Sequence, residues 1–482
     1  MKALAVASEM HPFVKTGGLG DVVGALPQAL AQHGVATTTM LPGYPQVMRA
    51  IGKSRIVARY PDLFGTAARL LRVKASGADL LVLDAPGLYA RDGGAYADSA
   101  GNDWRDNWRR FAALSAAAAD VAGGSIARFA PDVVHAHDWQ AAMAIAYMRH
   151  GRAADVPAVI TIHNLAFQGR FGADIFGALG LPASAFTVDG VEYYGGVGYL
   201  KAGLQYADAI TTVSPTYAAE IRTPAAGMGL DGLIAGRSGD LHGIVNGIDV
   251  GQWNPAADPA IPANYSARSL AARQRNRRAV EKRFGLARWD GPIFCVVSRL
   301  TWQKGMDLLL DAIDDLIAMG GRLALIGSGD QALEGGLLAA AARHRGRIGV
   351  VIGYDEGVSH LLQAGADAIL VPSRFEPCGL TQLYGLRYGC VPIVARTGGL
   401  ADTIIDANEA ALAAGVATGI LHEPGRGDSF RAAIAKAVSL FADRERWTAL
   451  QRAGMKADFS WNRSAARYAA LYASLIERKR AA

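Results

Sequence analysis

The sequence is poor in the features that mark secreted and membrane proteins. Only three cysteines occur in 482 residues, which is too few for a disulfide framework and indicates an intracellular protein. No stretch approaches the roughly twenty uninterrupted apolar residues that a membrane span needs. The apolar start at Ala3–Ala7 is interrupted by Glu9 and His11 too early for a signal peptide. We therefore expect a cytoplasmic protein that does not associate with membranes.

A strong excess of charge of one sign is also missing. The net charge is only +6, and the main basic run, between Arg273 and Arg283, has no aromatic residues interleaved with its cations. We interpret that run as a solvated helix face rather than a nucleic-acid-binding stripe, so no nucleic acid partner is expected. The mild positive balance favours an anionic small substrate.

What the sequence does contain is an alternation of short apolar runs with longer helical patterns rich in alanine and leucine. This pattern occurs in both halves of the chain and is typical of parallel α/β layers. The expected strands are 2–6, 80–83, 133–135, 158–163 and 209–213, then 293–297, 322–326, 349–352, 368–371 and 391–394. The stretch 246–262, rich in proline, glycine and short polar residues, reads as the connection, with a domain boundary near Ile248. Two doubly wound domains of this kind predict a cleft in which strand-to-helix loops bind the ligand.

The first of these loops is rich in glycine. Lys15 and the glycines Gly17, Gly18 and Gly20 follow the first strand and precede a helical run expected at 22–33. Glycines allow close backbone approach and direct free amides at an anion, and Lys15 adds a full charge. A plain glycine-rich turn with a solvated lysine is the alternative. The spacing fits neither the dinucleotide fingerprint nor the P-loop.

Two further strand ends in the first half carry histidines. We expect His135 and His137 to point to opposite faces of their strand, so that they do not share a metal ion. Asp138 is expected to cap the helix that follows, with substrate contact as a secondary role. His163 ends another strand, and its position at the carboxyl edge favours function over a purely structural hydrogen bond.

The second half carries cations and a carboxylate in comparable loops. Arg299 and Lys304 flank the loop after its first strand, and two fixed cations suit a departing diphosphate. A solvated pair is the alternative. Glu376 begins a loop that leads through Gly379 into a helix at Thr381. The carboxylate can serve a sugar and the loop amides a phosphate.

Taken in order, these segments resemble bacterial glycogen synthases and are similar to plant starch synthases. The resemblance covers essentially the whole chain, and an ordered set of motifs is far more specific than one glycine loop. A start at Met1 without a transit segment favours the bacterial form. The matching segments are Lys15–Val22, His135–Trp139, Gly203–Asp208, Val213–Pro215, Asn246–Asp249, Trp253–Pro255, Gln303–Gly305, Glu376–Thr381, Thr397–Leu400 and Phe459–Trp461.

The resemblance implies a GT-B fold, with two Rossmann-like domains facing across a deep cleft. Residues 1–247 would form the N-terminal domain, joined by a C-terminal crossover helix at 459–482, and residues 248–458 the nucleotide-sugar-binding domain. The implied reaction moves glucose from ADP-glucose to the non-reducing end of an α-1,4-glucan and retains the anomeric configuration. UDP-glucose as donor is the main alternative.

The resemblance also implies roles for individual residues. Glu376, Arg299, Lys304 and His163 would be catalytic. The expected substrate contacts are Lys15, Gly17, Gly18, Asp21, Asp138, Asn246, Tyr354, Cys378, Gly379, Leu380 and Thr381. Tyr354 is the candidate for stacking on adenine, with a packed strand-end tyrosine as the alternative. Arg277 stands where the family commonly has lysine, and it is left out of the site because reach and geometry differ between the two.

Neither a metal nor a cofactor is expected. The sequence lacks the Asp-x-Asp pair with which other sugar transferases hold a divalent ion, and fixed cations can replace that ion. An oxidoreductase or epimerase with two Rossmann domains is a weaker interpretation, because Gly327-Ser328-Gly329 lacks the rest of a dinucleotide loop. A non-catalytic glucan-binding protein would not need Arg299, Lys304 and Glu376 together. A phosphorylase would need a pyridoxal lysine, which we do not find.

Overall fold

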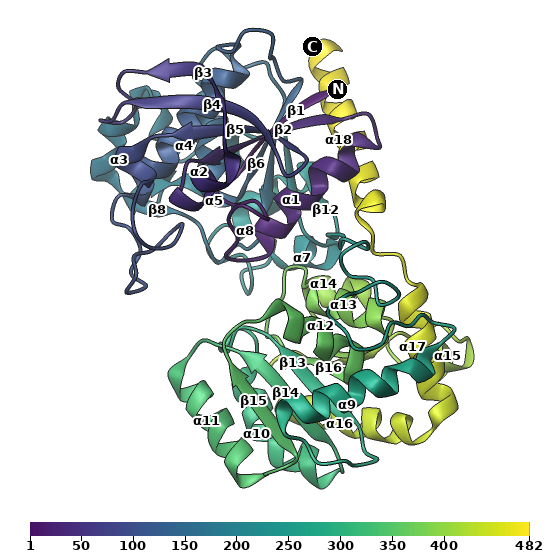
Figure 1. Ribbon diagram of the computed structural model, residues 1–482. Coiled ribbons are helices and arrows are strands. Elements are labelled where there is room, and N and C mark those ends of the chain that lie inside the picture. The colour runs from purple at the N-terminus through teal and green to yellow at the C-terminus, as the bar shows by residue number, and fades with distance from the viewer. Residues whose placement is uncertain (482) are drawn as a thin grey trace. The chain divides into compact units, whose positions relative to one another are not determined.

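The computed structural model describes residues 1–481, and the chain divides into two compact units (Figure 1). Unit 1 comprises Met1–Gly247 together with the chain from Trp461 onward, and unit 2 comprises Ile248–Ser460. Each unit is built around its own mainly parallel sheet with helices packed against it. The α/β class with two doubly wound, Rossmann-like sheets is therefore confirmed.

The sheet of unit 1 has nine strands in the order β12-β11-β7-β6-β1-β2-β5-β4-β3. All neighbours from β12 to β5 pair in parallel, and β5, β4 and β3 continue as an antiparallel edge. The strands are β1 (Lys2–Val6), β2 (Ala36–Pro42), β3 (Arg55–Tyr60), β4 (Ala68–Ala75), β5 (Ala78–Asp84), β6 (Val133–His137), β7 (Ala158–Ile162), β11 (Ala209–Thr212) and β12 (Leu241–Gly243).

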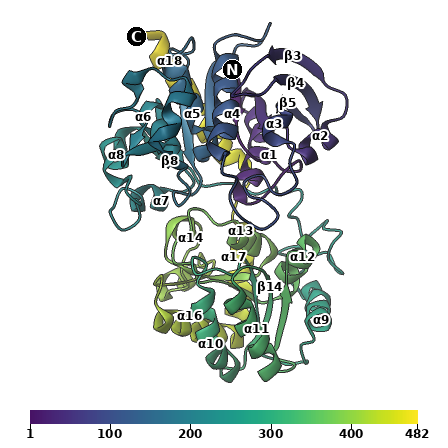
Figure 2. The same ribbon diagram turned by 90° about the vertical axis from the view of Figure 1, so that its left-hand side faces the viewer.

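Both faces of this sheet are covered. Alternate strand residues such as Ala3 and Val133 pack with helices α1 and α18, and their neighbours Leu4 and Val134 are also fully buried. Figure 2 shows α4, α5 and α6 side by side in this unit. The helices are α1 (Gly18–Ala31), α2 (Pro45–Ile51), α3 (Pro86–Tyr89), α4 (Asn107–Ala122), α5 (Asp138–Arg149), α6 (Tyr199–Tyr206), α7 (Pro215–Glu220), α8 (Asp231–Gly236) and α18 (Trp461–Ala481).

Unit 1 also contains a small second sheet and three short 3-10 helices. The small sheet has the antiparallel order β8-β10-β9. Its strands are β8 (Arg170–Gly172), β9 (Glu192–Tyr193) and β10 (Gly196–Gly198), and the 3-10 helices are η1 (Ala173–Leu179), η2 (Ala183–Ala185) and η3 (Ser238–Asp240).

The sheet of unit 2 is parallel throughout, in the order β15-β14-β13-β16-β17-β18. Alternate residues of one of its inner strands, β13, pack against helices on opposite faces, as in a sheet that is buried on both sides. Phe294 and Val296 pack in a core with α10, α11 and α16, whereas Ile293 and Cys295 pack with α9 and α12. The strands are β13 (Ile293–Val297), β14 (Arg322–Gly327), β15 (Ile348–Ile352), β16 (Ala368–Val371), β17 (Val391–Ala395) and β18 (Ile420–His422).

The helices of unit 2 follow the strands in regular alternation. They are η4 (Leu270–Ala272), α9 (Arg273–Phe284), α10 (Met306–Ala318), α11 (Gln331–Arg343), α12 (Glu356–Gly365), α13 (Thr381–Tyr388), α14 (Gly398–Thr403), α15 (Glu409–Ala413), α16 (Gly427–Ala442) and α17 (Arg444–Lys456). No helix within residues 1–481 combines the length and the apolar character required to span a membrane.

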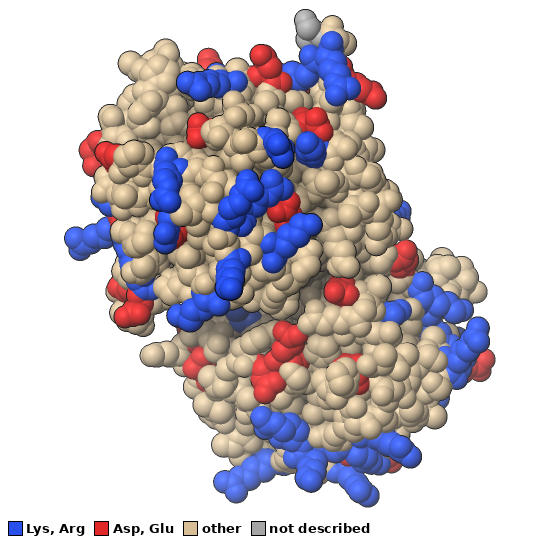
Figure 3. All heavy atoms as spheres, turned by 45° about the horizontal axis from the view of Figure 1, so that its top comes forward, with Lys and Arg blue, Asp and Glu red and all other residues tan. Residues whose placement is uncertain are grey.

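The basic helix α9 is only partly the solvated face that the sequence suggested. Arg273 and Arg277, one helical turn apart, are both buried. Arg277 forms an ion pair with Asp367 and donates to the Gly291 carbonyl at 2.6 Å, while Arg273 donates to the Ala364 carbonyl at 3.1 Å. The expectation of a solvated face is wrong for these two arginines, because every third or fourth residue of a helix faces the protein. On the face in Figure 3, Lys and Arg side chains lie in several groups with Asp and Glu between them.

Candidate active site

The candidate residues of unit 2 gather where β13 and its neighbour β16 end. Lys304 lies in the loop after β13 and Glu376 in the loop after β16. The Lys304 ammonium donates to Glu376 Oε2, and the Ser373 hydroxyl donates to the same oxygen at 3.0 Å. Only 9% of the Glu376 side chain and 19% of the Lys304 side chain are exposed. Burial of this kind strengthens the field that the two opposite charges exert on a bound ligand.

A cavity of about 50 Å³ opens beside this pair. Ser298, Lys304, Glu376, Gly379 and Thr381 are among the residues that line it. The cavity is therefore walled by both charges and by the loop that precedes α13. This is the edge at which doubly wound sheets bind their ligands.

The loop from Glu376 to Thr381 presents backbone groups at the start of α13. Gly379 has a φ of +72°, and a Cβ there would meet the Gln382 side chain at 2.5 Å. The first residue of α13 is Thr381, its N-cap is Leu380, and no side chain of residues 1–481 caps it. The first amides of such a helix have no partners inside the helix and suit an anion. Cys378 is buried in the same loop.

Two glycines that sequence reasoning did not place in the site hold this loop from behind. The Gly399 amide donates to the Glu376 carbonyl at 3.1 Å. A Cβ on Gly398 would lie 2.0 Å from the Glu376 carbonyl oxygen, and one on Gly399 would lie 2.3 Å from the Cys378 oxygen. Any side chain at either position would displace the loop that carries Glu376. The sequence signal for these two positions is the Gly-Gly pair within Thr397–Leu400.

Arg299, in the loop after β13, and Tyr354, after β15, lie at the same edge of unit 2 but outside this cavity. Arg299 is exposed, and its guanidinium forms no ion pair with any of the described residues. Tyr354 follows β15 and is 69% exposed, with its hydroxyl 3.4 Å from Glu356 Oε2. The packed-tyrosine alternative is therefore wrong, because most of the Tyr354 side chain is exposed. Neither residue lines the cavity beside Glu376.

In unit 1, the glycine loop is held by a carboxylate that sequence reasoning missed. Glu9 is 2% exposed and accepts from the Thr16 amide at 2.5 Å, from the Thr16 hydroxyl at 2.5 Å and from the Gly17 amide at 3.3 Å. The Tyr96 hydroxyl also donates to it. The Gly17 amide is therefore engaged by Glu9 rather than free for an anion, because Glu9 reaches back into the loop. In the sequence, Glu9 stood out only as an interruption of the apolar start.

The remaining residues of this loop lie at the start of α1. The helix begins at Gly18, four residues earlier than expected, so that Gly18 and Gly20 belong to its first turn. A Cβ at Gly17 or Gly18 would meet nothing within 4 Å, which indicates open space beside both. Lys15 Nζ lies 2.7 Å from Asp21 Oδ1, so these two candidates form an ion pair with each other.

Two expectations for the histidine-bearing strand ends are wrong, namely that His135 and His137 point to opposite faces and that Asp138 caps α5. His135 and His137 point to the same face of β6, with ring centroids 4.0 Å apart, because residues two apart on a strand share a face. His137 Nδ1 lies 3.0 Å from His163 Nε2. Asp138 does not cap α5, because its Oδ1 accepts from the His163 amide at 2.7 Å on the neighbouring strand end. Within residues 1–481, no group of three or more His, Cys, Asp or Glu side chains has the arrangement of a metal site.

Burial sets the protonation of this cluster. Burial lowers the pKa of His137 to about 3, and it lowers the pKa values of His135 and His163 well below their usual range. Burial raises the pKa of Asp138 to about 7, opposed by its hydrogen bonds from the His163 and Asn164 amides. Asp138 also has a φ of +57°. A strained backbone and a perturbed carboxyl together are typical of a functional site.

Asn246 is the last candidate in unit 1 and is set apart from the others. It follows β12, two strands away from β7 and His163. The residue is buried, yet its Oδ1 has no hydrogen-bond partner among residues 1–481. A buried acceptor in this state costs free energy until a donor reaches it. No described contact joins Asn246 to the Lys15 loop.

Comparisons with known proteins cover nearly the whole chain. Residues 2–236 match the family model described as starch synthase catalytic domain, and residues 278–453 match glycosyl transferases group 1. The chain is 63% identical over 479 residues to a glycogen synthase of Mesorhizobium japonicum, covering 99% of this chain and 100% of that protein. It is 62% identical over 481 residues to a glycogen synthase of Novosphingobium aromaticivorans, covering 99% of each.

Solved structures agree with these sequence relatives. The catalytic domain of starch synthase IV from Arabidopsis thaliana, bound to ADP and acarbose, superposes with a TM-score of 0.89 at 31% identity, over 98% of this chain and 99% of that one. A sucrose-phosphate synthase from Thermosynechococcus elongatus reaches a TM-score of 0.61 at 17% identity over 99% of each chain, which shows the shared fold alone.

Proposed function

The chain belongs to the glycogen synthase family, and from this premise we propose that it transfers glucose from ADP-glucose to the non-reducing end of an α-1,4-glucan. The anomeric configuration is retained. Besides the family, the observation that carries the proposal is the Lys304–Glu376 pair at the mouth of the β13–β16 cavity. The choice of ADP is supported by the ADP bound to the Arabidopsis starch synthase. The reaction takes place in the cytoplasm.

In the proposed reaction, charge placement lowers the barrier. Retaining transfer passes through a transition state with oxocarbenium character, which needs negative charge near the anomeric carbon and positive charge at the departing phosphate. Glu376 supplies the negative charge, and Lys304 and Arg299 supply the positive charge. The amides from Cys378 to Thr381 assist the phosphates, since they belong to the loop and first turn of α13.

The residues of unit 1 take the complementary roles. Lys15 and Gly18 contact the diphosphate and sugar, with Asp21 holding the Lys15 ammonium. Gly17 lies against the same groups through its Cα, because Glu9 accepts from its amide and the space beside its Cα is open. His163 and Asn246 contact sugar hydroxyls, and the unsatisfied Asn246 Oδ1 is an acceptor suited to one of them. Asp138 holds the backbone of His163 in place, because its carboxylate accepts a hydrogen bond from the His163 amide. Tyr354 in unit 2 stacks on adenine with its exposed ring.

The proton balance needs no second carboxylate in unit 2. As the glucosyl–phosphate bond breaks, the leaving phosphate takes the proton of the acceptor hydroxyl, and that oxygen forms the new glycosidic bond on the same face of the sugar. A glucosyl adduct trapped on Glu376 would contradict this step. No cofactor takes part in the proposed reaction.

The test is a donor panel. ADP-glucose, UDP-glucose and GDP-glucose are compared for incorporation into glycogen by the wild-type protein, by Glu376→Gln and by Glu409→Gln, an exposed glutamate of α15. ADP-glucose should be the best donor. Glu376→Gln should lower kcat by about a hundredfold or more, and Glu409→Gln should match wild type. Turnover with UDP-glucose but not with ADP-glucose would refute the donor assignment and leave the family intact.

A further inference from the structure

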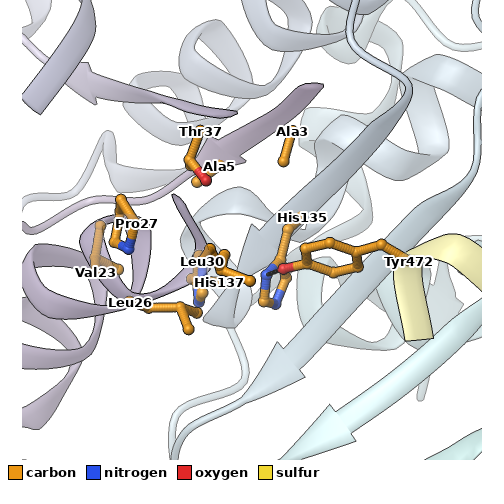
Figure 4. Close-up of a pocket in the computed structure, with 10 residues that line it drawn as sticks. All are labelled: Ala3, Ala5, Val23, Leu26, Pro27, Leu30, Thr37, His135, His137 and Tyr472. Atoms are coloured by element: carbon orange, nitrogen blue, oxygen red, sulfur yellow. Dashed lines mark hydrogen bonds between the residues drawn. The ribbon is translucent and has the colours of Figure 1, made fainter. Parts of the chain in front are cut away.

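The C-terminal helix α18 reaches into the histidine cluster through a single buried tyrosine. Tyr472 is 1% exposed, and Figure 4 shows its ring extending from α18 to His135 on β6. The Tyr472 hydroxyl lies 2.6 Å from His135 Nδ1. Together with His137 and Thr37, these residues line a cavity of about 10 Å³, which is too small for more than a single water. A residue 337 positions away in the sequence thus touches the strand that ends at Asp138.

The hydrogen bonds around His135 have one direction that satisfies every donor. His135 Nε2 lies 2.5 Å from the Thr161 hydroxyl, which lies 2.5 Å from the Thr211 hydroxyl. Thr211 can donate onward to the Ile160 carbonyl at 3.4 Å, which only accepts. Tyr472 then donates to Nδ1, His135 donates from Nε2, and each threonine donates to the next group.

The reverse direction fails at its tyrosine end. If His135 carried its proton on Nδ1, the Tyr472 hydroxyl would accept that proton and would have to donate elsewhere. Among residues 1–481, His135 Nδ1 is the only hydrogen-bonding partner of this buried hydroxyl. An unsatisfied buried hydroxyl is costly. Tyr472 therefore selects the Nε2–H tautomer of His135 and fixes its ring at both nitrogens.

The fixed ring of His135 is the surface against which the next histidine packs. The His135 and His137 rings are 4.0 Å apart with 36° between their planes, and His137 Nδ1 lies 3.0 Å from His163 Nε2. Four aromatic rings, those of Tyr472, His135, His137 and His163, therefore contact one another in sequence from α18 to the end of β7. A shift of the first ring displaces the second, because tightly packed interiors transmit small displacements.

From this chain of contacts we infer that Tyr472 is a positioning residue for His163, acting through the rings of His135 and His137. The inference rests on the proposed function, in which His163 contacts the transferred sugar. It gives α18 a role beyond closing the core of unit 1: the C-terminal helix sets the angle of a histidine in the site.

The test compares variants that remove single hydroxyls. Tyr472→Phe keeps the ring and loses the bond to His135 Nδ1, and Thr161→Val keeps the shape and loses the bond to Nε2. Tyr468→Phe is the matched control, because Tyr468 packs against the same His135 ring from the same helix, at 5.5 Å between centroids, while both ring nitrogens are already engaged. Each variant is assayed for kcat, for KM of ADP-glucose and for thermal stability, and histidine side-chain 15N NMR reports the tautomers.

We expect Tyr472→Phe and Thr161→Val each to lower kcat by about tenfold, with KM for ADP-glucose changed by less than about twofold. The double variant should lose little more than either single variant, since both break one chain. The NMR signals of His135 and His163 should change in Tyr472→Phe and stay unchanged in Tyr468→Phe.

Two outcomes would overturn the inference. One is an unchanged His163 signal and kcat in Tyr472→Phe, and the other is an equal loss of kcat in Tyr468→Phe, which would reduce the effect to helix packing. If the wild-type protein transfers no glucose from ADP-glucose, the proposed function fails. In that case the His135 and His163 signals still decide whether Tyr472 positions the ring.

Discussion

At the scale of single residues, the candidate site of unit 2 combines two fixed cations with a carboxylate. The Lys304 ammonium contacts Glu376, and Arg299 is exposed on the loop that also carries Lys304. In many phosphoryl and glycosyl transfers a divalent metal neutralises the diphosphate, but side-chain cations held by the fold can take that role. Their charge is always present, whereas a metal ion must be recruited from solution.

This arrangement predicts turnover without a divalent ion. In excess EDTA, the incorporation of glucose from ADP-glucose into glycogen should continue at the untreated rate. Arg299→Met should lower kcat/KM by about a hundredfold, and added magnesium should not restore it. Loss of wild-type activity in EDTA that returns on addition of magnesium would contradict this view of the site.

The buried histidines of unit 1 give the stability a definite dependence on pH. Burial lowers the pKa of His137 to about 3 and lowers those of His135 and His163 as well. Below pH 6.5 the unfolded chain binds protons that the folded chain excludes, so stability falls as the pH falls. Asp138 acts in the opposite sense, because its pKa is raised to about 7 and the folded form binds its proton first. Because three histidines oppose one carboxyl, the free energy of unfolding still decreases as the pH falls.

The free energy of unfolding of unit 1 should therefore decrease from pH 7.5 to pH 5.5. Each excluded proton contributes a slope of up to about 1.4 kcal/mol per pH unit. Urea unfolding at the two pH values measures the decrease, and His137→Gln should show a smaller one. A His137→Gln variant with the same decrease as wild type would exclude this histidine as a source.

The sequence identifies those site candidates whose side-chain type and position in a strand-to-helix loop are enough to indicate a role. Glycines, cations and a carboxylate in strand-to-helix loops point to anion binding, and Lys304, Glu376 and Gly379 do line one cavity. Glu9 could not be found this way, because its function in the loop depends on reaching Thr16 and Gly17 in three dimensions. Asp138 was assigned to its own helix, whereas its partner lies on the neighbouring strand.

At the scale of elements, strands that are apolar throughout were predicted with their bounds. β1, β13 and β16 begin and end where the sequence pattern placed them. The missed strands have different compositions. β2 carries three threonines, and β3 and β4 form an antiparallel edge in which β3 has no buried residue and β4 mixes buried with exposed residues. In a single sequence, a polar or half-exposed strand resembles a loop, because it is stabilised by pairing with its neighbouring strand rather than by its own apolar pattern.

The connection from Ile248 to Pro262 is itself an ordered element of unit 2. Asp258 is 3% exposed, and its Oδ2 accepts from the Tyr388 hydroxyl at 2.6 Å and lies 2.7 Å from His360 Nδ1. Its Oδ1 accepts from the Ala260 amide at 2.8 Å. The Trp253 ring stacks on His360 at 3.9 Å and on Tyr384 at 3.6 Å. The segment that looked like a linker is therefore clamped to α12 and α13.

Removing this carboxylate should loosen unit 2. Asp258→Ala leaves the Tyr388 hydroxyl and the His360 ring buried without their acceptor, and it should lower the free energy of unfolding by about 3 kcal/mol or more. Urea denaturation of wild type, Asp258→Ala and the exposed control Asp290→Ala gives the comparison. A midpoint for Asp258→Ala that matches the control would mean that the clamp contributes nothing.

At the scale of the whole molecule, the chain is organised around two mainly parallel sheets, and most candidate site residues follow the carboxyl ends of their strands. In unit 1 the site residues follow β1, β6 and β7, which are neighbours, and Asn246 follows β12. In unit 2 they follow β13, β15 and β16. A starch synthase at 31% identity superposes with a TM-score of 0.89, and a shared topology places the same strand-to-helix loops at the carboxyl edges of both chains.

The path of the chain makes unit 1 depend on its last helix. The chain leaves unit 1 after Gly247 and returns at Trp461, and α18 then buries Trp461, Ala465, Tyr468, Ala469, Leu471, Tyr472 and Leu475 in the core that α1 also covers. These seven apolar side chains contribute on the order of 10 kcal/mol before the entropy of ordering the helix is subtracted. That amount is comparable to the whole stability of a typical domain.

A chain that stops after Ser460 should therefore lose unit 1 and keep unit 2. Limited proteolysis should degrade residues 1–247 rapidly and leave a resistant fragment that begins near Ile248, and transfer from ADP-glucose should disappear. A chain that stops after Glu477 is the matched control, since it keeps all seven buried apolar side chains of α18 and removes exposed positions such as Arg478–Arg480. It should resist proteolysis like wild type. If the shorter chain were equally resistant over residues 1–247, α18 would be dispensable for the core, and the positioning role of Tyr472 would have to act on a unit already complete without it.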